Sequence, residues 1–123
     1  MNFTQAGRKR LKDTWHYSVT RTIKHVGCHL AGFERKMIDL GDGRQYSYYD
    51  NNRSGKEVLL LIHGFNADKD HWLSLSHRLK QYRIIAPDLC GHGESWYEAS
   101  YKHDIPFYVD ELKRFADAMG LNR

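Results

Sequence analysis

The sequence has 123 residues, of which 41% are hydrophobic, and this is enough for one modest core rather than two independent ones. The mean hydropathy of -0.72, without any apolar run near the roughly 18 residues that cross a bilayer, excludes a membrane-spanning helix. The net charge of +4 is uneven, because residues 1–36 hold eight Lys or Arg against two acids, whereas residues 37–123 hold eleven against thirteen. We therefore expect a basic N-terminal extension on a mildly acidic body, and no nucleic-acid partner.

The N-terminal part of the chain predicts one long amphipathic helix. No apolar leader or small-residue cleavage site follows Met1–Gln5, so we expect a cytoplasmic protein. Large apolar residues then recur every three or four positions, at Leu11, Trp15, Val19, Ile23, Val26, Leu30 and Phe33. This stripe favours packing on the rest of the domain. The alternative is peripheral binding of residues 8–36 to an anionic membrane surface.

The two cysteines and their neighbours do not predict a disulfide or a metal site. Cys28 and Cys90 are far apart in unlike contexts, so we expect both to be reduced thiols. His25, Cys28 and His29 fall on about one helical turn, but the sequence suggests no fourth ligand for a metal ion.

The next segments predict a hairpin and then a buried strand. Two short strands are expected at Arg35–Leu40 and Arg44–Asp50, joined by Gly41-Asp42-Gly43, because Asp-Gly supplies the positive φ that tight hairpin turns need. The unbroken apolar run Val58–Ile62 is typical of a strand buried on both faces of a parallel sheet.

The remaining elements predict a parallel α/β unit. A helix is expected over Asp68–Lys80, a second buried strand over Tyr82–Ala86, and a last helix over Tyr108–Met119 that ends at Gly120. Strand, helix, strand, loop and helix in this order predict a right-handed parallel unit that follows the hairpin, and hence an α/β fold.

Two loops follow the two buried strands, at His63–Asp68 and Asp88–Ser95. Open α/β sheets bind their ligands at this end of the strands. A glycine directly after a strand lets backbone N–H groups approach a ligand, and such fixed donors can polarise a carbonyl oxygen. His63 itself is more often a strand-end histidine held by hydrogen bonds than a catalytic base.

These loops resemble those of the α/β-hydrolase fold family of esterases and lipases. His63-Gly64-Phe65-Asn66, with Asp68–Trp72 behind it, is similar to the family's oxyanion-hole loop. Ala86–Leu89 and Gly91–Ser95 are similar to the loop after its fourth strand, although Cys90 stands where the family usually has Pro. The resemblance starts near residue 35. It divides the chain into a basic helical extension, 1–34, and the N-terminal half of a hydrolase domain, 35–123.

The resemblance implies roles for single residues. Phe65 would donate its backbone N–H to the developing oxyanion, and its side chain would help to line the acyl pocket. His63 and Gly64 would shape the loop, the histidine through side-chain hydrogen bonds to backbone. The other residues expected near the pocket are Asn66, Asp88, Gly91, His92, Gly93 and Ser95. No metal or cofactor is implied, and the expected substrate is a small-molecule or lipid ester.

The family's Gly-x-Ser-x-Gly nucleophile elbow is missing, because none of the seven serines has glycine at both flanking positions. The resemblance thus implies half of an oxyanion hole and none of the catalytic triad. One hypothesis is a partial serine hydrolase that is inactive alone and hydrolyses carboxylic esters when complete. The alternative is a non-catalytic binding or membrane-surface module on a truncated hydrolase fold. The expected open edge at Val58–Ile62 favours the first, because native proteins avoid exposed apolar edges.

Overall fold

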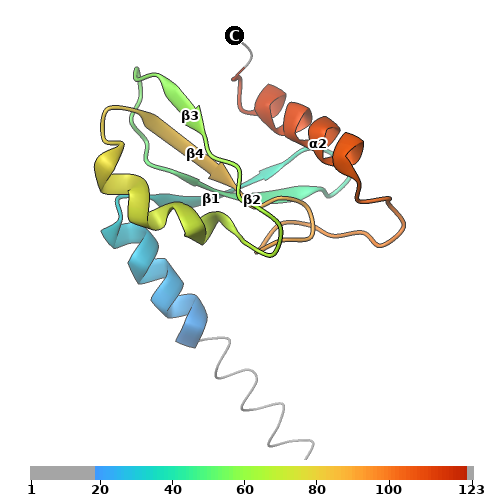
Figure 1. Cartoon of the computed structure of the whole chain (residues 1–123), viewed down its shortest axis with the longest axis horizontal. Helices are drawn as coiled ribbons and strands as arrows, with labels where there is room; N and C mark the ends of the chain where they lie inside the picture. Colours follow the sequence, from blue (N-terminus) through green and yellow to red (C-terminus); the bar gives the residue numbers. More distant parts are fainter. Residues whose placement is uncertain (1–18, 122–123) are drawn as a thin grey trace, which may run out of the picture.

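The computed structural model describes residues 19–121 and shows one mixed sheet with helices on both faces (Figure 1). Residues 19–30 are helical, and the elements after them are β1 (Glu34–Asp39), β2 (Gln45–Asp50), β3 (Val58–Leu60), the 3-10 helix η1 (Lys69–Arg78), β4 (Arg83–Pro87) and α2 (Ile105–Ala118). The strands lie in the order β1-β2-β4-β3, with β3 parallel to β4 and the other neighbours antiparallel. The predicted α/β fold class, a hairpin followed by a parallel unit, is confirmed.

The hairpin of β1 and β2 forms around the predicted turn. Asp42 and Gly43 both have positive φ angles, of 57° and 74°. The register places Met37 opposite Ser47 and Ile38 opposite Tyr46. The Asp-Gly pair therefore fixes the register of the hairpin, as such turns do.

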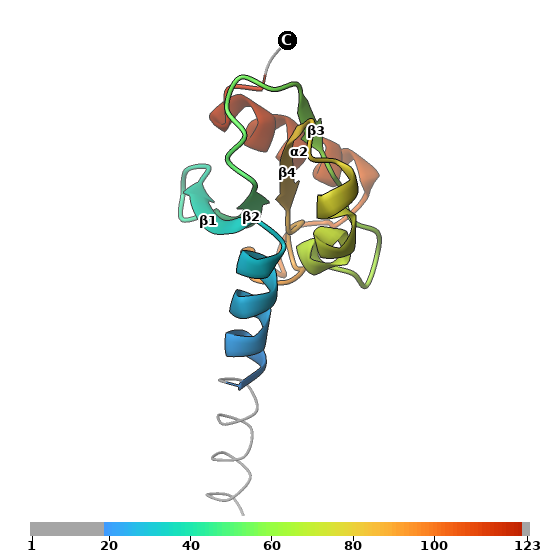
Figure 2. The same cartoon turned by 90° about the vertical axis from the view of Figure 1, so that its left-hand side faces the viewer.

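The sheet separates two apolar clusters, one under each helical layer (Figure 2). Ile84 and Ala86 of β4 belong to the cluster that Cys28, Phe33 and the side chains of η1 complete. Ile85, between them in sequence, faces the other way and packs with Phe115 of α2. This alternation places β4 at the centre of the fold and predicts that its neighbouring loops are held from both sides.

The strand predicted over Val58–Ile62 is shorter and less buried than expected. Only Val58–Leu60 forms β3, and all three residues are half-buried. Its position in the sheet explains the difference, because β3 is the last strand in the order and pairs with β4 alone. The expectation of burial on both faces was wrong, whereas the expected open edge is confirmed for the described residues.

The helix predicted over Asp68–Lys80 is a 3-10 helix. Asp68 is its N-cap, and the aspartate side chain accepts a hydrogen bond of 2.9 Å from the Asp70 N–H. Trp72, Leu73 and Leu79 still pack on the sheet. The spacing of Trp72, Leu75 and Leu79 thus predicted two of the packed residues, Trp72 and Leu79, but not Leu73, and it predicted the type of helix incorrectly.

The helix at residues 19–30 does not pack its apolar stripe on the body. Ile23, Val26 and Leu30 are 65%, 54% and 81% exposed, so the predicted packing was wrong for these three positions, whereas Phe33 at the end of the stripe is buried in the core as predicted. The helix is instead held at its end by Cys28, which is buried in the core. Leu11 and Trp15 lie outside the described residues. Within residues 19–121, no helix is long and apolar enough to cross a bilayer.

Candidate functional site

The loops after β3 and β4 are joined by a buried histidine. The Leu89 N–H donates to His63 Nε2 at 2.9 Å, and His63 Nδ1 lies 2.8 Å from the Gly64 carbonyl oxygen. Because a backbone N–H can only donate, Nε2 accepts, and the ring proton sits on Nδ1, where it is donated to Gly64. His63 is 3% exposed. Both of its nitrogens are thus engaged in holding the loop, which leaves neither free to act as a base.

Asp88 fixes the second loop to the start of η1. Its carboxylate is fully buried and accepts from the Lys69 N–H at 2.8 Å, from the Lys69 ammonium at 2.6 Å and from the Glu94 N–H at 3.0 Å. Gly93 lies so close that a Cβ there would meet the carboxylate at 2.3 Å, and its φ angle is +52°. The loop after β4 therefore requires both a carboxylate at 88 and a glycine at 93.

Ser95 ties the same loop to β2. Its hydroxyl donates to the Asp88 carbonyl oxygen at 2.7 Å and accepts from the Ser47 N–H at 3.0 Å. A serine that already donates its proton to a buried carbonyl has no base beside it to activate it. The geometry gives Ser95 a structural position rather than that of a nucleophile.

Aromatic rings join the tips of the two loops. The His92 ring lies 5.0 Å from that of His63 and 6.2 Å from that of Phe65, and its Nδ1 is 3.0 Å from the Cys90 carbonyl oxygen. Gly91 has a φ of +76° and donates to the Trp96 carbonyl oxygen at 2.9 Å. The loops that the sequence analysis paired are therefore adjacent in the fold.

Phe65 and Asn66 form the exposed tip of the first loop. The Phe65 side chain is 88% exposed, and among residues 19–121 its backbone N–H has no hydrogen-bond acceptor. The Ala67 N–H donates to the Gly64 carbonyl oxygen at 3.2 Å, which closes a turn around Asn66 with its φ of 58°. Space is open above Gly64, where a Cβ would meet no atom within 4 Å. The turn thus presents a free N–H donor beside room for a ligand.

Two buried polar groups near this site were missed by the sequence analysis. Lys69 is 2% exposed and forms an ion pair with Asp88. The Tyr49 hydroxyl donates a hydrogen bond to the Asp70 carboxylate. Burial, followed by this hydrogen bond, raises the pKa of Tyr49. The only sequence feature that could have indicated these buried groups is the charged run Asp68-Lys69-Asp70 at a helix start, and such a run is also typical of a solvated surface. Among the described residues, no group of three or more His, Cys, Asp or Glu side chains is arranged to hold a metal ion.

Comparisons with known proteins identify the family of the chain. No protein-family model matches the chain. Lipase 1 of Psychrobacter immobilis is 42% identical over 104 residues, which are 85% of this chain and 33% of the lipase. Lipase 3 of Moraxella sp. (strain TA144) is 40% identical over 120 residues, or 98% of this chain and 38% of the lipase.

The structural comparison agrees with the sequence comparison. The crystal structure of a bacterial membrane phospholipase A matches with a TM-score of 0.79 and 27% identity over 100% of this chain and 42% of that one. The chain thus spans well under half the length of the relatives it matches. It belongs to the esterases and lipases of the α/β-hydrolase fold family and matches a part of that fold.

Proposed function

We propose that residues 63–66 form one half of the oxyanion hole of a carboxylic ester hydrolase, with the Phe65 N–H as the donor. The observation that carries the proposal is this unpaired N–H at the exposed tip of a loop that His63 holds rigid. A donor that is fixed before the reaction stabilises the charge that develops on the carbonyl oxygen at no cost of reorganisation. Open space above Gly64 supports the approach of a substrate carbonyl.

In the proposal, the other predicted site residues hold the neighbouring loop or border the pocket entrance. Asp88, Gly91, Gly93 and Ser95 hold the second loop in place, while Asn66 and His92 border the pocket entrance beside Phe65. The reaction is acyl transfer to a serine and then to water. The 123 residues hold no Gly-x-Ser-x-Gly elbow, so the proposed site needs a nucleophile that this sequence does not contain. The lipase and phospholipase relatives support an ester of a lipid or of a small molecule as substrate.

A chimera tests the donor. Residues 35–121 of this chain replace the matching segment of the Psychrobacter immobilis lipase, and hydrolysis of a short-chain aryl ester is measured. Phe65→Pro removes the N–H, so kcat should fall by roughly 100- to 1,000-fold, the range for a lost oxyanion donor. Phe65→Ala keeps the N–H and should lose far less. Equal losses in the two variants, with folding shown intact by circular dichroism, would assign the effect to the side chain and contradict the proposal.

The 123-residue chain on its own provides the complementary test. Without a nucleophile or a base, it should hydrolyse the same aryl ester no faster than a denatured sample does. Turnover by the purified chain that disappears in Ser95→Ala would overturn this view of the site, because it would make the structural serine the nucleophile.

A second candidate function is peripheral binding to an anionic membrane, and the exposed apolar stripe favours it. Ile23, Val26 and Leu30 face away from the body on a helix that also carries Arg21 and Lys24. Apolar side chains beside basic ones are typical of helices that lie in a membrane interface. Residues 8–36 would make this contact with the membrane. They include most of the helical extension, residues 1–34, which precedes the hydrolase part, residues 35–123. The cytoplasmic location stays a prediction.

Vesicle co-sedimentation tests the second candidate. Binding to anionic vesicles should exceed binding to neutral ones and should weaken as salt rises, because exposed charges are screened. Ile23→Ser with Val26→Ser should reduce the bound fraction several-fold. Ile105→Ser, which changes a 76% exposed residue on α2, is the matched control and should leave it unchanged. Equal binding to neutral and anionic vesicles, or none to either, rules the membrane contact out.

A further inference from the structure

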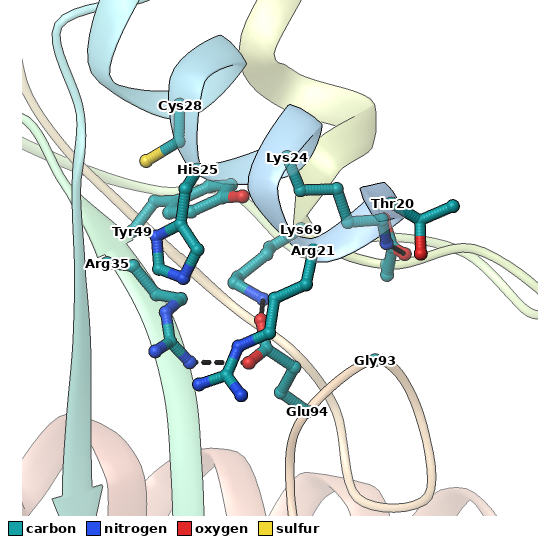
Figure 3. Close-up of a pocket in the computed structure, with 11 residues that line it drawn as sticks. Thr20, Arg21, Lys24, His25, Cys28, Arg35, Tyr49, Lys69, Gly93 and Glu94 are labelled. Carbon is teal, nitrogen blue, oxygen red and sulfur yellow. Dashed lines mark hydrogen bonds and ion pairs between the residues drawn. The ribbon is translucent and has the colours of Figure 1, made fainter. Parts of the chain in front are cut away.

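A pocket of about 280 Å³ lies between the helix at residues 19–30 and the loop after β4 (Figure 3). Its walls come from five parts of the chain, one of which is the start of η1 with Asp68 and Lys69. The helix contributes Arg21 and His25, β1 contributes Arg35, β2 contributes Tyr49, and the loop contributes Glu94. It does not include His63 or Phe65, so the pocket is separate from the proposed oxyanion site.

The cations around the pocket differ in how completely they are neutralised. Lys24 is paired with Asp68 at 3.3 Å and with Asp70 at 2.9 Å. Lys69 is paired with Asp88 at 2.6 Å. These pairs leave two guanidinium groups, those of Arg21 and Arg35, for the single carboxylate of Glu94.

The Glu94 carboxylate is itself shared between two cations. It pairs with Arg35 and lies 3.2 Å from the Lys69 ammonium. Arg21 has no hydrogen-bond or ion-pair partner among residues 19–121, and His25 has none either. The formal charges of the four cations and of the four carboxylates at the pocket balance, but the Arg21 guanidinium and the His25 ring keep donors that no described residue accepts.

The unpaired donors face the same space. In Figure 3, the side chains of Arg21, His25 and Arg35 extend into the pocket from two different elements. The Nε of Arg35 is buried and lacks an acceptor, which is unfavourable for a buried donor. Two guanidinium groups that converge also repel each other. An acceptor with negative charge in the pocket would relieve both costs.

We propose that this pocket binds a phosphate group, held by Arg21 and Arg35 with His25 as a further donor. Guanidinium groups present planar pairs of N–H donors that match phosphate oxygens. Donors that come from two elements suit a tetrahedral anion, because its oxygens point in several directions. The pocket is also large enough to admit a substituent on the phosphate. The phosphate can be free or belong to the headgroup of a lipid, and the proposal does not depend on ester hydrolysis.

Equilibrium dialysis of the 123-residue chain against radiolabelled inorganic phosphate, at constant ionic strength in chloride, tests the site. Binding should saturate at one phosphate per chain. Arg21→Gln should weaken it about tenfold, the loss expected for one charge-assisted contact. Arg21 is exposed and unpaired, so this change should not disturb folding. Lys113→Gln, which removes an exposed charge from α2, is the matched control and should change binding less than twofold.

Vesicles distinguish the two sources of phosphate. Co-sedimentation is compared between phosphatidylcholine vesicles that carry phosphatidic acid and vesicles that carry oleate at equal surface charge. A headgroup site predicts stronger binding to phosphatidic acid, reduced by Arg21→Gln and by added phosphate. Saturable dialysis without this preference supports free phosphate as the ligand. No saturable phosphate binding together with equal binding to both vesicle types, or equal losses in Arg21→Gln and Lys113→Gln, would overturn the proposal.

Discussion

At the scale of single residues, the loop after β4 depends on a contact that only glycine allows. Gly93 packs against the Asp88 carboxylate, which in turn holds Lys69 and the Glu94 N–H. A methyl group at 93 has to displace this buried carboxylate, and the backbone there has a positive φ as well. The whole arrangement around the candidate site is therefore sensitive to one Cβ.

Gly93→Ala should lower the free energy of unfolding by about 2–4 kcal/mol, from overpacking and the strained backbone together. Gly64→Ala is the matched control, because a Cβ there meets no atom within 4 Å and φ is not positive. It should cost less than about 1 kcal/mol. Urea denaturation of the two variants measures the difference. Similar costs at the two positions would contradict the close packing of Gly93 on Asp88.

The lowered pKa of Asp50 predicts how the free energy of unfolding changes at acidic pH. Burial alone would raise the pKa of this carboxyl, but hydrogen bonds from Arg83, from the Asn52 N–H and from Lys36 outweigh it, and the pKa lies below its ordinary 3.8. A lowered pKa means that the carboxylate stabilises the fold above pH 3.8 and loses this effect as the pH falls toward the folded-state pKa.

Asp50→Asn should therefore be less stable than the wild type near neutral pH, and the two unfolding free energies should converge as the pH falls below about 3.8. Urea denaturation across this range measures the convergence. A constant difference between the two proteins down to the lowest pH would show that the carboxylate contributes nothing through its charge.

At the scale of elements, α2 is docked on the hairpin through one buried carboxylate. Glu111 is 2% exposed and accepts from the Tyr46 hydroxyl at 2.7 Å and from Arg44 at 2.8 Å. Arg44 also lies over the rings of Trp96 and Tyr101, at 5.1 and 5.0 Å. The hairpin, the loop before α2 and the helix thus meet at a single guanidinium group.

A double-mutant cycle of Tyr46→Phe and Glu111→Gln should show this coupling. Each single change should destabilise the protein by about 1–3 kcal/mol, since each leaves a buried group without its partner. The double mutant should cost less than the sum, with an interaction of about 0.5–3 kcal/mol. Chemical denaturation measures all four proteins, and strictly additive costs would exclude a direct contribution from the pair.

The elements differ in how far the sequence predicts them. The turn at Asp42-Gly43 and the strand at 83–87 are set by local signals, a positive-φ dipeptide and an apolar run before Pro87. Local sequence does not determine which way the apolar stripe of the helix at 19–30 faces. Tertiary contacts determine it, because Cys28 in the core and ion pairs with η1 anchor the helix. The partnership of Lys69 with Asp88 depends on which loops the sheet brings together, and no spacing in the sequence encodes it.

At the scale of the whole molecule, the four-stranded sheet of residues 19–121 has two end strands, β1 and β3. β3 ends the strand order, and its side facing away from β4 has no strand partner among the described residues. The backbone groups on that side seek hydrogen bonds, and no charge or proline interrupts Val58–Leu60. A second copy of the chain can satisfy these groups by pairing edge to edge.

The 123-residue chain should therefore self-associate through β3, and Leu60→Lys should reduce the association by placing a charge at the C-terminal end of this edge strand. Leu60 is half-buried, so the same change can also unfold the domain, and circular dichroism has to accompany the measurement. Ile105→Lys adds the same charge at an exposed position on α2 and should leave the association unchanged. Sedimentation velocity over a range of concentrations compares the three proteins. A wild-type chain that stays monomeric at high concentration and unfolds cooperatively would show that the edge is protected, and would favour a self-sufficient binding module over a partial enzyme.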